Sequence, residues 1–464
     1  MQRYEIAIIG SGPAGYVGAI KAAREGFPTA IIEKGDFGGV CLNTGCIPTK
    51  ALVASAKQLR NIRRAADFGI DLKGSVSAIF QKLYERMNHV VDIERKGLIK
   101  LVENSGTEII KGQASFVDDN VLKISGADSE KTINAKNIII ATGSNPKSLP
   151  FLPFDGEKVV SSNDLLSLES LPESMIIIGG GYIGCEFASI FSALGTKITI
   201  IEALPSLLMN VDEDIVKVLT REFKKEGVEV RANSQIVGAK VADKVTVTLA
   251  DGTDISADVC LVSVGRRPLT EGLAIEDIGL PILPDGTIKV NERMMTDIPG
   301  VFAVGDVVGN PMLAYVASAE CKVAVGNALG NRLLMDYTVI PIGIFTYPEI
   351  GSVGVTERQA RSAGVDVKTG TVLLRSLGIS HASGDIVGMA KLVADSVSDM
   401  IIGVHIIGER ATDLVHEAAV AMYQGMTASA FGNVLHTHPT FSEIVSEAAH
   451  AVNGTAIFSG KQAA

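Results

Sequence analysis

The sequence has few cysteines, no excess of positive charge and no long apolar run. Its five cysteines among 464 residues are an odd number without framework spacing, which disfavours a secreted disulfide scaffold and favours the cytoplasm. The formal net charge of −10 disfavours nucleic acid, because phosphate binding rewards basic surfaces. No apolar run approaches the roughly 20 residues of a membrane-spanning helix. We therefore expect a soluble protein with neither nucleic acid nor a membrane as a partner.

The length predicts a chain of about three domains, since a domain averages roughly 150 residues. An apolar fraction of 47%, a charged fraction of 20% and 48 glycines are typical of a folded protein with many tight turns. The N-terminal stretch MQRYEIAIIGSGPAGYVGAIKAA is short and apolar, as a signal peptide is. Glu5 and the glycines interrupt it and no polar cleavage context follows, so we interpret it as folded structure.

A repeated pattern organises the first part of the chain. The segments IAIIGSGPAG at 6–15 and MIIIGGGYIG at 175–184 each join a short apolar strand to G-x-G-x-x-G, and a helical stretch follows. Glu33 and Glu202 each lie 23 positions after the first glycine of their copy, Gly10 and Gly179, at the end of a second apolar run. One such motif is weak, because an ordinary glycine turn can produce it. Two copies with the same offset are hard to obtain by chance.

Each copy contains the parts that a dinucleotide site requires. The glycines let the backbone approach a pyrophosphate, the helix N-terminus supplies partial positive charge, and the acid accepts a hydrogen bond from a ribose hydroxyl. The sequence therefore predicts an α/β protein with two Rossmann-like units and two bound dinucleotides.

Later segments extend this pattern. Each unit closes with a strand that ends in glycine, within NIIIATGSNP and DVCLVSVGRRP. The stretch GVFAVGDVVG at 300–309 adds a strand and a turn acid, Asp306, whose simpler interpretation is a helix N-cap. From about residue 340, strand-like segments such as IIGVHIIG precede the helical stretch ATDLVHEAAVAMYQGM, which predicts a third, α+β domain.

Two cysteines stand five positions apart in GGVCLNTGCIPTK, residues 38–50. In a regular helix the Cα atoms of such a pair are about 8 to 9 Å apart, beyond the roughly 7 Å limit of a disulfide. A Cys41–Cys46 bond therefore needs a helix that is distorted or only beginning, which Gly45 and Pro48 permit. Such a bond suits thiol exchange, and Lys50 would stabilise a thiolate. Two free core cysteines or an inert staple remain the alternative, and buried positions in the core are expected for Cys185, Cys260 and Cys321.

The stretch GGVCLNTGCIPTK matches throughout the redox signature of the pyridine nucleotide disulfide oxidoreductases, and the chain resembles that family from end to end. The repeat, ATGSNP, VFAVGDV and the tail HTHPTFSE all take part. The resemblance implies an FAD-binding domain with a redox-active disulfide at 1–148 and an NAD-binding domain at 149–270. A central region at 271–340 would complete the FAD site, and an interface domain would occupy 341–464.

The resemblance also implies an activity and partners. The expected enzyme oxidises a protein-bound dihydrolipoyl dithiol and passes its electrons through Cys41 and Cys46 to FAD and then to NAD⁺. The expected partners are a second copy of the chain and the lipoyl carrier domains of 2-oxo acid dehydrogenase or glycine cleavage complexes. Which of these complexes it serves is left open.

By resemblance, both dinucleotide sites can be assigned residue by residue. Lys50 and Glu186 are expected to pair near the flavin, and Tyr182 to cover the nicotinamide pocket. Tyr315 departs from the histidine that many members have, and Cys321 from a glycine or acid. The residues assigned to FAD are Gly10, Gly12, Gly15, Glu33, Lys50, Ala114, Gly143, Ser144, Asp306, Met312, Leu313, Ala314 and Tyr315. Those assigned to NAD are Gly179, Gly181, Tyr182, Gly184, Glu202 and Gly265, with Glu186 between the two sites.

The charge of Glu202 and the absence of Arg and Lys from EALPSLLMN favour NAD over NADP.

The tail HTHPTFSEIVSEAA at 436–449 places His438 five residues before Glu443. An imidazole oriented by a carboxylate can take a thiol proton near neutral pH. From the residues alone, a plain surface histidine and a metal site with His436 remain open, although no further ligand is spaced nearby and we expect no metal. By resemblance, His438 is the base, Glu443 orients it, and both act in the active site of the other subunit.

Rival functions fit less well. Mercuric reductases share the redox signature but add a C-terminal cysteine pair, which GTAIFSGKQAA lacks. Glutathione and trypanothione reductases are disfavoured by the acid at Glu202, and related NADH oxidases use a single cysteine. A non-catalytic structural subunit of a large complex would have no need of both cysteines, Lys50 and the pair His438 and Glu443.

Overall fold

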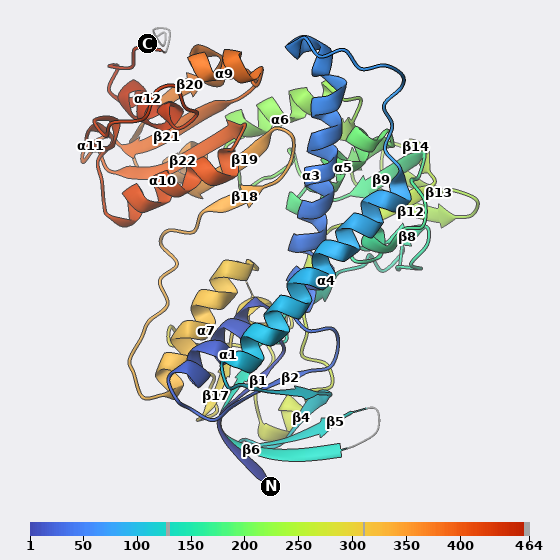
Figure 1. Cartoon of the computed structure of the whole chain (residues 1–464), viewed down its shortest axis with the longest axis vertical. Helices are drawn as coiled ribbons and strands as arrows, with labels where there is room; N and C mark the ends of the chain where they lie inside the picture. Colours follow the sequence, from blue (N-terminus) through green and yellow to red (C-terminus); the bar gives the residue numbers. More distant parts are fainter. Residues whose placement is uncertain (127–129, 310, 459–464) are drawn as a thin grey trace.

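The computed structural model describes residues 1–126, 130–309 and 311–458. Its lowest part in Figure 1 is a seven-stranded sheet in the order β3-β2-β1-β6-β5-β4, with β17 also paired to β6. The pairs of β1 with β2 and β6, of β2 with β3, and of β17 with β6 are parallel. The strands are β1 (Gln2–Ile9), β2 (Thr29–Glu33), β3 (Glu108–Lys111), β4 (Gln113–Asp118), β5 (Val121–Ser125), β6 (Glu130–Ile140) and β17 (Val301–Ala303).

The central strand β1 is apolar because both of its faces are covered. Ile6 and Ile8 pack with side chains of α1 (Pro13–Arg24) and α7 (Ala314–Ala328) on one face. Ala7 and Ile9 pack on the other face with side chains of β4 and β5. The strand–glycine–helix order predicted for the first unit is confirmed, and its glycine motif lies at the carboxyl end of β1.

The second unit repeats this plan with a five-stranded parallel sheet in the order β11-β10-β9-β15-β8. A small antiparallel sheet, β12-β13-β14, packs against it and shares its apolar cluster. The chain enters and leaves this unit through the antiparallel pair β7–β16. The elements are β7 (Ser144–Pro146), β8 (Val159–Val160), β9 (Ser174–Ile178), α5 (Tyr182–Leu194), β10 (Lys197–Ile201), α6 (Glu213–Lys225), β11 (Glu229–Arg231), β12 (Ile236–Val241), β13 (Val245–Leu249), β14 (Asp254–Ala257), β15 (Val259–Val262) and β16 (Arg266–Pro268).

The third unit, at the upper left of Figure 1, is an antiparallel sheet in the order β18-β19-β22-β21-β20. The apolar faces of α10 and α12 pack on it, with Val415 and Ile444 in the same cluster as Val404. The α+β domain predicted from about residue 340 is thus confirmed. Its elements are β18 (Ile342–Ile344), β19 (Glu349–Gly354), α8 (Glu357–Ser362), β20 (Val367–Leu373), α9 (Gly378–Ser383), β21 (Met389–Asp395), β22 (Ile401–Gly408), α10 (Ala411–Tyr423), α11 (Ala428–Gly432) and α12 (Glu443–Val452).

Three helices of the first unit lie outside its sheet: α2 (Gly39–Asn43), α3 (Cys46–Arg63) and α4 (Phe80–Asn104). In Figure 1, α3 runs upward between the second and third units. Leu52 of α3, Phe191 of α5 and Ile407 of β22 belong to one buried cluster. The helix that begins at the second cysteine is therefore held by both neighbouring units. No helix in the described ranges is long and apolar enough to cross a membrane.

The close backbone contact between β20 and α12 gives a test of how the third unit packs. A Cβ on Gly370 would lie 2.1 Å from the carbonyl oxygen of Ala448, which belongs to α12. We expect Gly370→Ala to destabilise the protein by about 1–3 kcal/mol, because the backbone has to move apart. A lower midpoint of thermal unfolding would register this loss.

Gly378 provides the matched control, since a Cβ there would meet no atom within 4 Å. Gly378→Ala should leave the midpoint within the scatter of repeat measurements. Equal midpoints for the two variants would contradict the packing described.

Candidate active site

The two cysteines 41 and 46 form a disulfide, and the helix is interrupted between them. Helix α2 ends at Asn43, and α3 begins at Cys46 after Gly45, whose φ and ψ of −142° and −111° are not helical. The Cα atoms of Cys41 and Cys46 are 4.7 Å apart, well inside the bonding range. A Cβ on Gly45 would lie 2.9 Å from the carbonyl oxygen of Val40, so the turn has no room for a side chain. The predicted break in the helix is confirmed.

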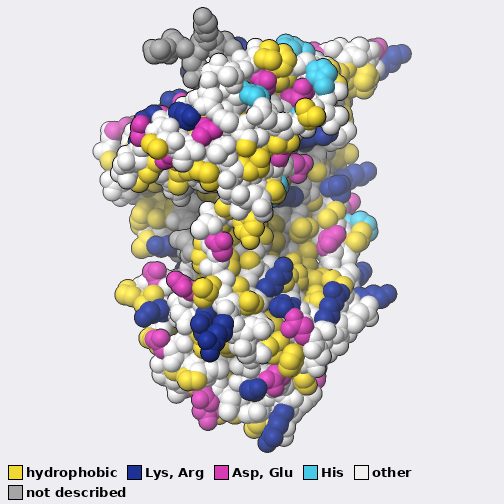
Figure 2. Space-filling model, turned by 90° about the vertical axis from the view of Figure 1, so that its left-hand side faces the viewer, with side chains coloured by type: hydrophobic (Ala, Val, Ile, Leu, Met, Phe, Trp, Pro, Cys, Tyr) yellow, Lys and Arg dark blue, Asp and Glu magenta, His cyan; other side chains and the backbone are white. Residues whose placement is uncertain are grey.

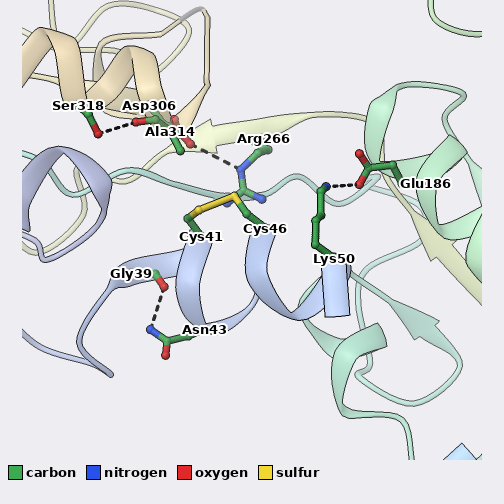
Figure 3. The surroundings of a disulfide bond; sticks show 10 residues. All are labelled: Gly39, Cys41, Asn43, Cys46, Lys50, Glu186, Arg266, Asp306, Ala314 and Ser318. Atoms are coloured by element: carbon green, nitrogen blue, oxygen red, sulfur yellow. Dashed lines mark hydrogen bonds and ion pairs between the residues drawn. A yellow bond between two sulfur atoms is a disulfide. The ribbon is translucent and has the colours of Figure 1, made fainter. Parts of the chain in front are cut away.

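Side chains hold this turn from outside. The amide of Asn43 donates to the carbonyl oxygen of Gly39 at 2.9 Å, as Figure 3 shows, and its oxygen accepts from Arg95 Nε at 2.8 Å. Cys46 is the first residue of the 18-residue helix α3. The partial positive charge at a helix N-terminus stabilises a thiolate. The N-terminus of α3 therefore favours the thiolate form of a reduced Cys46.

Lys50, one turn further along α3, connects three elements. Its Nζ lies 2.7 Å from Glu186 Oε2 on α5 and 4.3 Å from the centre of the Phe345 ring. The other oxygen of Glu186 accepts from the backbone N–H of Phe345 at 2.9 Å. The predicted pair of Lys50 and Glu186 is present, and it ties the disulfide helix to the second unit and to the start of the third.

Arg266 is a site residue that the sequence analysis missed. Its Nε donates to Ser144 Oγ at 2.7 Å and its Nη2 to the Ser144 carbonyl oxygen at 2.7 Å. Ser144 Oγ in turn donates to Asp306. The carboxylate of Asp306 lies 3.8 Å from Arg266 Nε, a contact drawn in Figure 3. Burial lowers the pKa of the guanidinium, and the charge of Asp306 partly restores it. The only signal in the sequence is its place directly after Gly265, the glycine assigned to NAD.

The first glycine motif forms an open cradle at the end of β1. A Cβ on Gly15 would lie 1.8 Å from the carbonyl oxygen of Gly10, whereas one on Gly12 would meet nothing within 4 Å. Glu33 Oε2 accepts from the backbone N–H of Ser11 at 2.9 Å, so the acid lies beside the motif. A pocket is lined by Gly10, Glu33 and Ala114 together. These are the residues expected around the adenosine of FAD, and the open backbone at Gly12 fits a pyrophosphate.

The second motif has the same geometry. A Cβ on Gly184 would lie 2.1 Å from the carbonyl oxygen of Gly179, and one on Gly181 would meet nothing within 4 Å. Glu202 Oε2 accepts from the backbone N–H of Gly180 at 2.6 Å. Tyr182 is the first residue of α5, and burial raises the pKa of its hydroxyl. The residues present therefore fit a second dinucleotide.

The residues 312–315 lead into α7, which begins at Ala314 after Leu313. The hydroxyl of Tyr315 donates to the carbonyl oxygen of Pro341, at the start of the third unit. Ser318 Oγ, one turn on, donates to the Pro13 carbonyl oxygen at 3.1 Å. The start of α7 is thereby placed against α1 and its glycine motif.

His438 and Glu443 meet at the start of α12. The imidazole Nδ1 of His438 lies 2.8 Å from Glu443 Oε1, and Glu443 Oε2 accepts from the Thr440 N–H at 2.8 Å. Burial alone would raise the pKa of Glu443, but the hydrogen bonds from His438 and Thr440 lower it. The carboxylate of Glu443 is therefore ionised at neutral pH and holds the imidazole of His438 by its Nδ1.

The two histidines of the tail, His436 and His438, contact different carboxylates. His436 Nε2 lies 2.7 Å from Glu417 Oε1 on α10, so each histidine has its own carboxylate. Within the ranges that the structure describes, no group of three or more His, Cys, Asp or Glu side chains could hold a metal ion. The side chain of His438 is 73% exposed. In Figure 1, α11 and α12, which flank it, lie far from the N-terminus of α3.

The other three cysteines are buried and unbonded, as expected: Cys185, Cys260 and Cys321. Burial raises the pKa of the Cys260 thiol to about 12, with a smaller contribution from the charge of Asp155. Protonated, enclosed thiols are poor nucleophiles. The thiol chemistry of the described residues therefore resides in the pair at the start of α3.

Comparison with known proteins agrees with this arrangement. Residues 4–321 match the family model described as pyridine nucleotide-disulphide oxidoreductase, and residues 340–449 match the dimerisation domain of the same family. Dihydrolipoyl dehydrogenase of Geobacillus stearothermophilus is 40% identical over 457 residues, which cover 98% of this chain and 97% of that protein. A dihydrolipoyl dehydrogenase of Bacillus subtilis is 38% identical over 97% of this chain and 99% of that protein.

Solved structures show the same architecture. LpdA from Mycobacterium tuberculosis superposes with a TM-score of 0.90 at 27% identity, over 97% of this chain and 99% of that one. The HOCl-induced flavoprotein disulfide reductase RclA from Escherichia coli has a TM-score of 0.86 at 28% identity, over 96% and 99%.

The ion pair of Lys50 and Glu186 gives a test of how the disulfide helix is held. Lys50→Met would leave the Glu186 carboxylate, whose side chain is 10% exposed, without its cation. We expect the free energy of unfolding to fall by about 1–3 kcal/mol. This is less than for a fully buried pair, because Lys50 reaches solvent. The midpoint of urea-induced unfolding should fall, and adding Glu186→Gln should recover part of the loss.

Lys136→Met is the matched control, because Lys136 pairs with Glu5 at the surface with 69% of its side chain exposed. That change should cost no more than about 0.5 kcal/mol. A Lys50 variant as stable as the Lys136 variant would show that the pair contributes nothing.

Proposed function

The chain belongs to the pyridine nucleotide-disulphide oxidoreductase family, and we propose that within it the protein is a dihydrolipoyl dehydrogenase that serves lipoyl-bearing complexes. It is an oxidoreductase that uses FAD and NAD, as this family does. The observation that carries the proposal is the Cys41–Cys46 disulfide at the start of α3, in a chain related over nearly its whole length to dihydrolipoyl dehydrogenases.

The thiol chemistry follows from the geometry of the two cysteines. A substrate thiolate attacks Sγ of Cys41, forms a mixed disulfide and releases Cys46 as a thiolate, which the N-terminus of α3 stabilises. The second thiol of the substrate then attacks the substrate sulfur of the mixed disulfide. This step closes the lipoyl disulfide and releases Cys41 as a thiolate. The substrate dithiol has been oxidised by two electrons, and the cystine has been reduced to a dithiol by the same pair.

The remaining electron transfer belongs to the bound cofactors. Bound FAD would supply two-electron transfer between the reduced cysteines and NAD⁺, so that overall one dithiol and one NAD⁺ would yield one disulfide, NADH and a proton. Cys46 is proposed to face the flavin. Lys50, paired with Glu186, supplies positive charge beside it, and Arg266 holds Ser144 and Asp306 on the flavin side.

A base is needed for the substrate thiol, and we assign this role to His438 of the other subunit. The ionised Glu443 orients the imidazole of His438, and 73% of the His438 side chain is exposed in the single chain. The dimerisation domain at 340–449 supports a homodimer. Figure 2 shows histidine side chains on the upper part of one face and a recess with hydrophobic side chains beneath it, a surface suited to a second copy.

The proposed division of the chain keeps the predicted boundaries: FAD binding at 1–148, NAD binding at 149–270, a central region at 271–340 and the interface domain at 341–464. The pairing of β17 with β6 supports the assignment of the central region to the FAD side. Gly10, Gly12, Gly15 and Glu33 are proposed to hold the adenosine and pyrophosphate of FAD. The cytoplasm is proposed as its location, because three unbonded cysteines and the lack of a disulfide framework suit a reducing compartment.

Anaerobic mixing of the purified flavoprotein with dihydrolipoamide tests this function. Reduction of the cystine should produce a long-wavelength absorption of the thiolate against the flavin, and addition of NAD⁺ should then yield NADH. Cys41→Ser should abolish NADH formation, whereas Cys260→Ala, which removes a buried unbonded thiol, should retain it. If dihydrolipoamide produced neither the band nor NADH while glutathione disulfide was reduced by NADH, the assignment would be wrong.

Preference for NAD is a second prediction. The carboxylate of Glu202 points to the glycine motif and would repel a 2′-phosphate, and 202–210 contain no Arg or Lys. We expect NADP⁺ to be used at least about tenfold less efficiently than NAD⁺, measured as kcat/KM. Glu202→Gln should narrow this gap by removing the charge. Comparable efficiencies in the unmodified protein would defeat the prediction.

A further inference from the structure

The segment that joins Glu202 to α6 lies directly on the second glycine motif. We call residues 203–212 the NAD strap. The backbone N–H of Leu208 donates to the Gly180 carbonyl oxygen at 2.9 Å, and that of Leu204 donates to Glu202 Oε1 at 2.8 Å. A Cβ on Gly180 would lie only 2.4 Å from Leu207 Cδ2. The strap is therefore in direct contact with both Glu202 and the backbone of Gly180.

The strap does not hold this conformation by local preference. Leu208 has a φ of 48°, in the left-handed region that a branched side chain rarely occupies. Such a conformation persists when surrounding contacts enforce it. Leu207 and Leu208 are buried, at 1% and 3% exposure, so packing contributes on the inner side. The outer side needs a separate support.

That support comes from the third unit of the chain. Arg358 of α8 donates from Nη2 to the carbonyl oxygen of Met209 at 2.8 Å. Lys391 of β21 lies 3.1 Å from Asp212 Oδ1 and 2.7 Å from Asp214 Oδ2. Asp212 is also the N-cap of α6, accepting from the Asp214 N–H at 3.1 Å. One cation thus holds the middle of the strap, and another holds its end.

The contact at Lys391 is enclosed and charged. The side chains of Lys391 and Asp212 are 3% and 1% exposed, and Glu357 Oε2 lies 2.8 Å from Lys391 Nζ. Burial by itself lowers the pKa of Lys391, but the hydrogen bonds to Asp214 and Glu357 and the charge of Asp212 raise it above its ordinary value. The ammonium is therefore kept, and its removal would leave Asp212 buried without a cation.

We propose that Lys391 and Arg358 are positioning residues for NAD, through which the interface domain holds the strap against Gly180 and Glu202. Neither residue touches the disulfide or the first glycine motif in the described structure. This inference rests on the proposed NAD site. It implies that loss of either contact weakens NAD binding and leaves the dithiol half of the reaction unchanged.

Arg358→Ala is the first test, because Arg358 is exposed and its removal does not open the core. We expect about a three- to tenfold rise in the KM for NAD⁺, with kcat and the rate of flavin reduction by dihydrolipoamide within about twofold of the unmodified protein. Arg358→Lys, which can still donate to the Met209 carbonyl, should recover most of the affinity. Lys368→Ala is the control in the same unit, since Lys368 of β20 bonds Asn453 and Asp399 instead of the strap or Glu357.

Lys391→Met should act in the same direction and more strongly, by about ten- to a hundredfold in the KM for NAD⁺. Calorimetric titration with NAD⁺ measures the affinity without any lipoyl substrate, so a failed dithiol reaction in the unmodified protein would count against the proposed function alone. If Lys391→Met does not fold, the comparison of Arg358→Ala with Lys368→Ala decides the matter. Unchanged NAD⁺ affinity in Arg358→Ala, or an equal loss in Lys368→Ala, would overturn the inference.

Discussion

A disulfide between residues five apart forces the chain to leave the helical conformation between them, and the placement of α3 follows from that constraint. Gly45 makes the break, because no side chain fits against the Val40 carbonyl. Helix α3 then begins at Cys46 and extends for 18 residues between the other two units. This single break in the helix places the sulfur of Cys46 at the helix N-terminus, which stabilises its thiolate. The same break places Lys50 one turn later.

Cations cross the boundaries between the second unit and both of its neighbours. Lys50 of the first unit pairs with Glu186 of the second, Arg266 returns from the second to Ser144 of the first, and Lys391 of the third reaches Asp212 of the second. A buried charge that loses its partner is costly, so the units are stable only in arrangements that keep these pairs together. The dinucleotide sites lie beside these contacts, which links the relative placement of the units to cofactor binding.

The two dinucleotide units show how the same backbone problem is solved twice. In each, the third glycine of the motif approaches the carbonyl oxygen of the first too closely for any side chain, and an acid from the next strand returns to the motif. The units differ in what supports them. The first receives β17 and α7 from later in the chain, whereas the second is buttressed by the interface domain through the strap.

The sequence by itself determined the elements whose signals are local. The glycine motifs, the offsets to Glu33 and Glu202, the cysteine spacing and the turn between His438 and Glu443 depend on neighbouring residues, so the strands, helices and both candidate site clusters could be predicted from it. Contacts between distant segments left no such signal. The tertiary structure alone decided that Arg266 reaches Ser144 and that Lys391 reaches Asp212, 179 positions away. A long side chain finds such a partner only after the three units have packed together. The sequence left a plain surface histidine open as one interpretation of His438, and only the packing of the folded chain decided that 73% of its side chain is exposed.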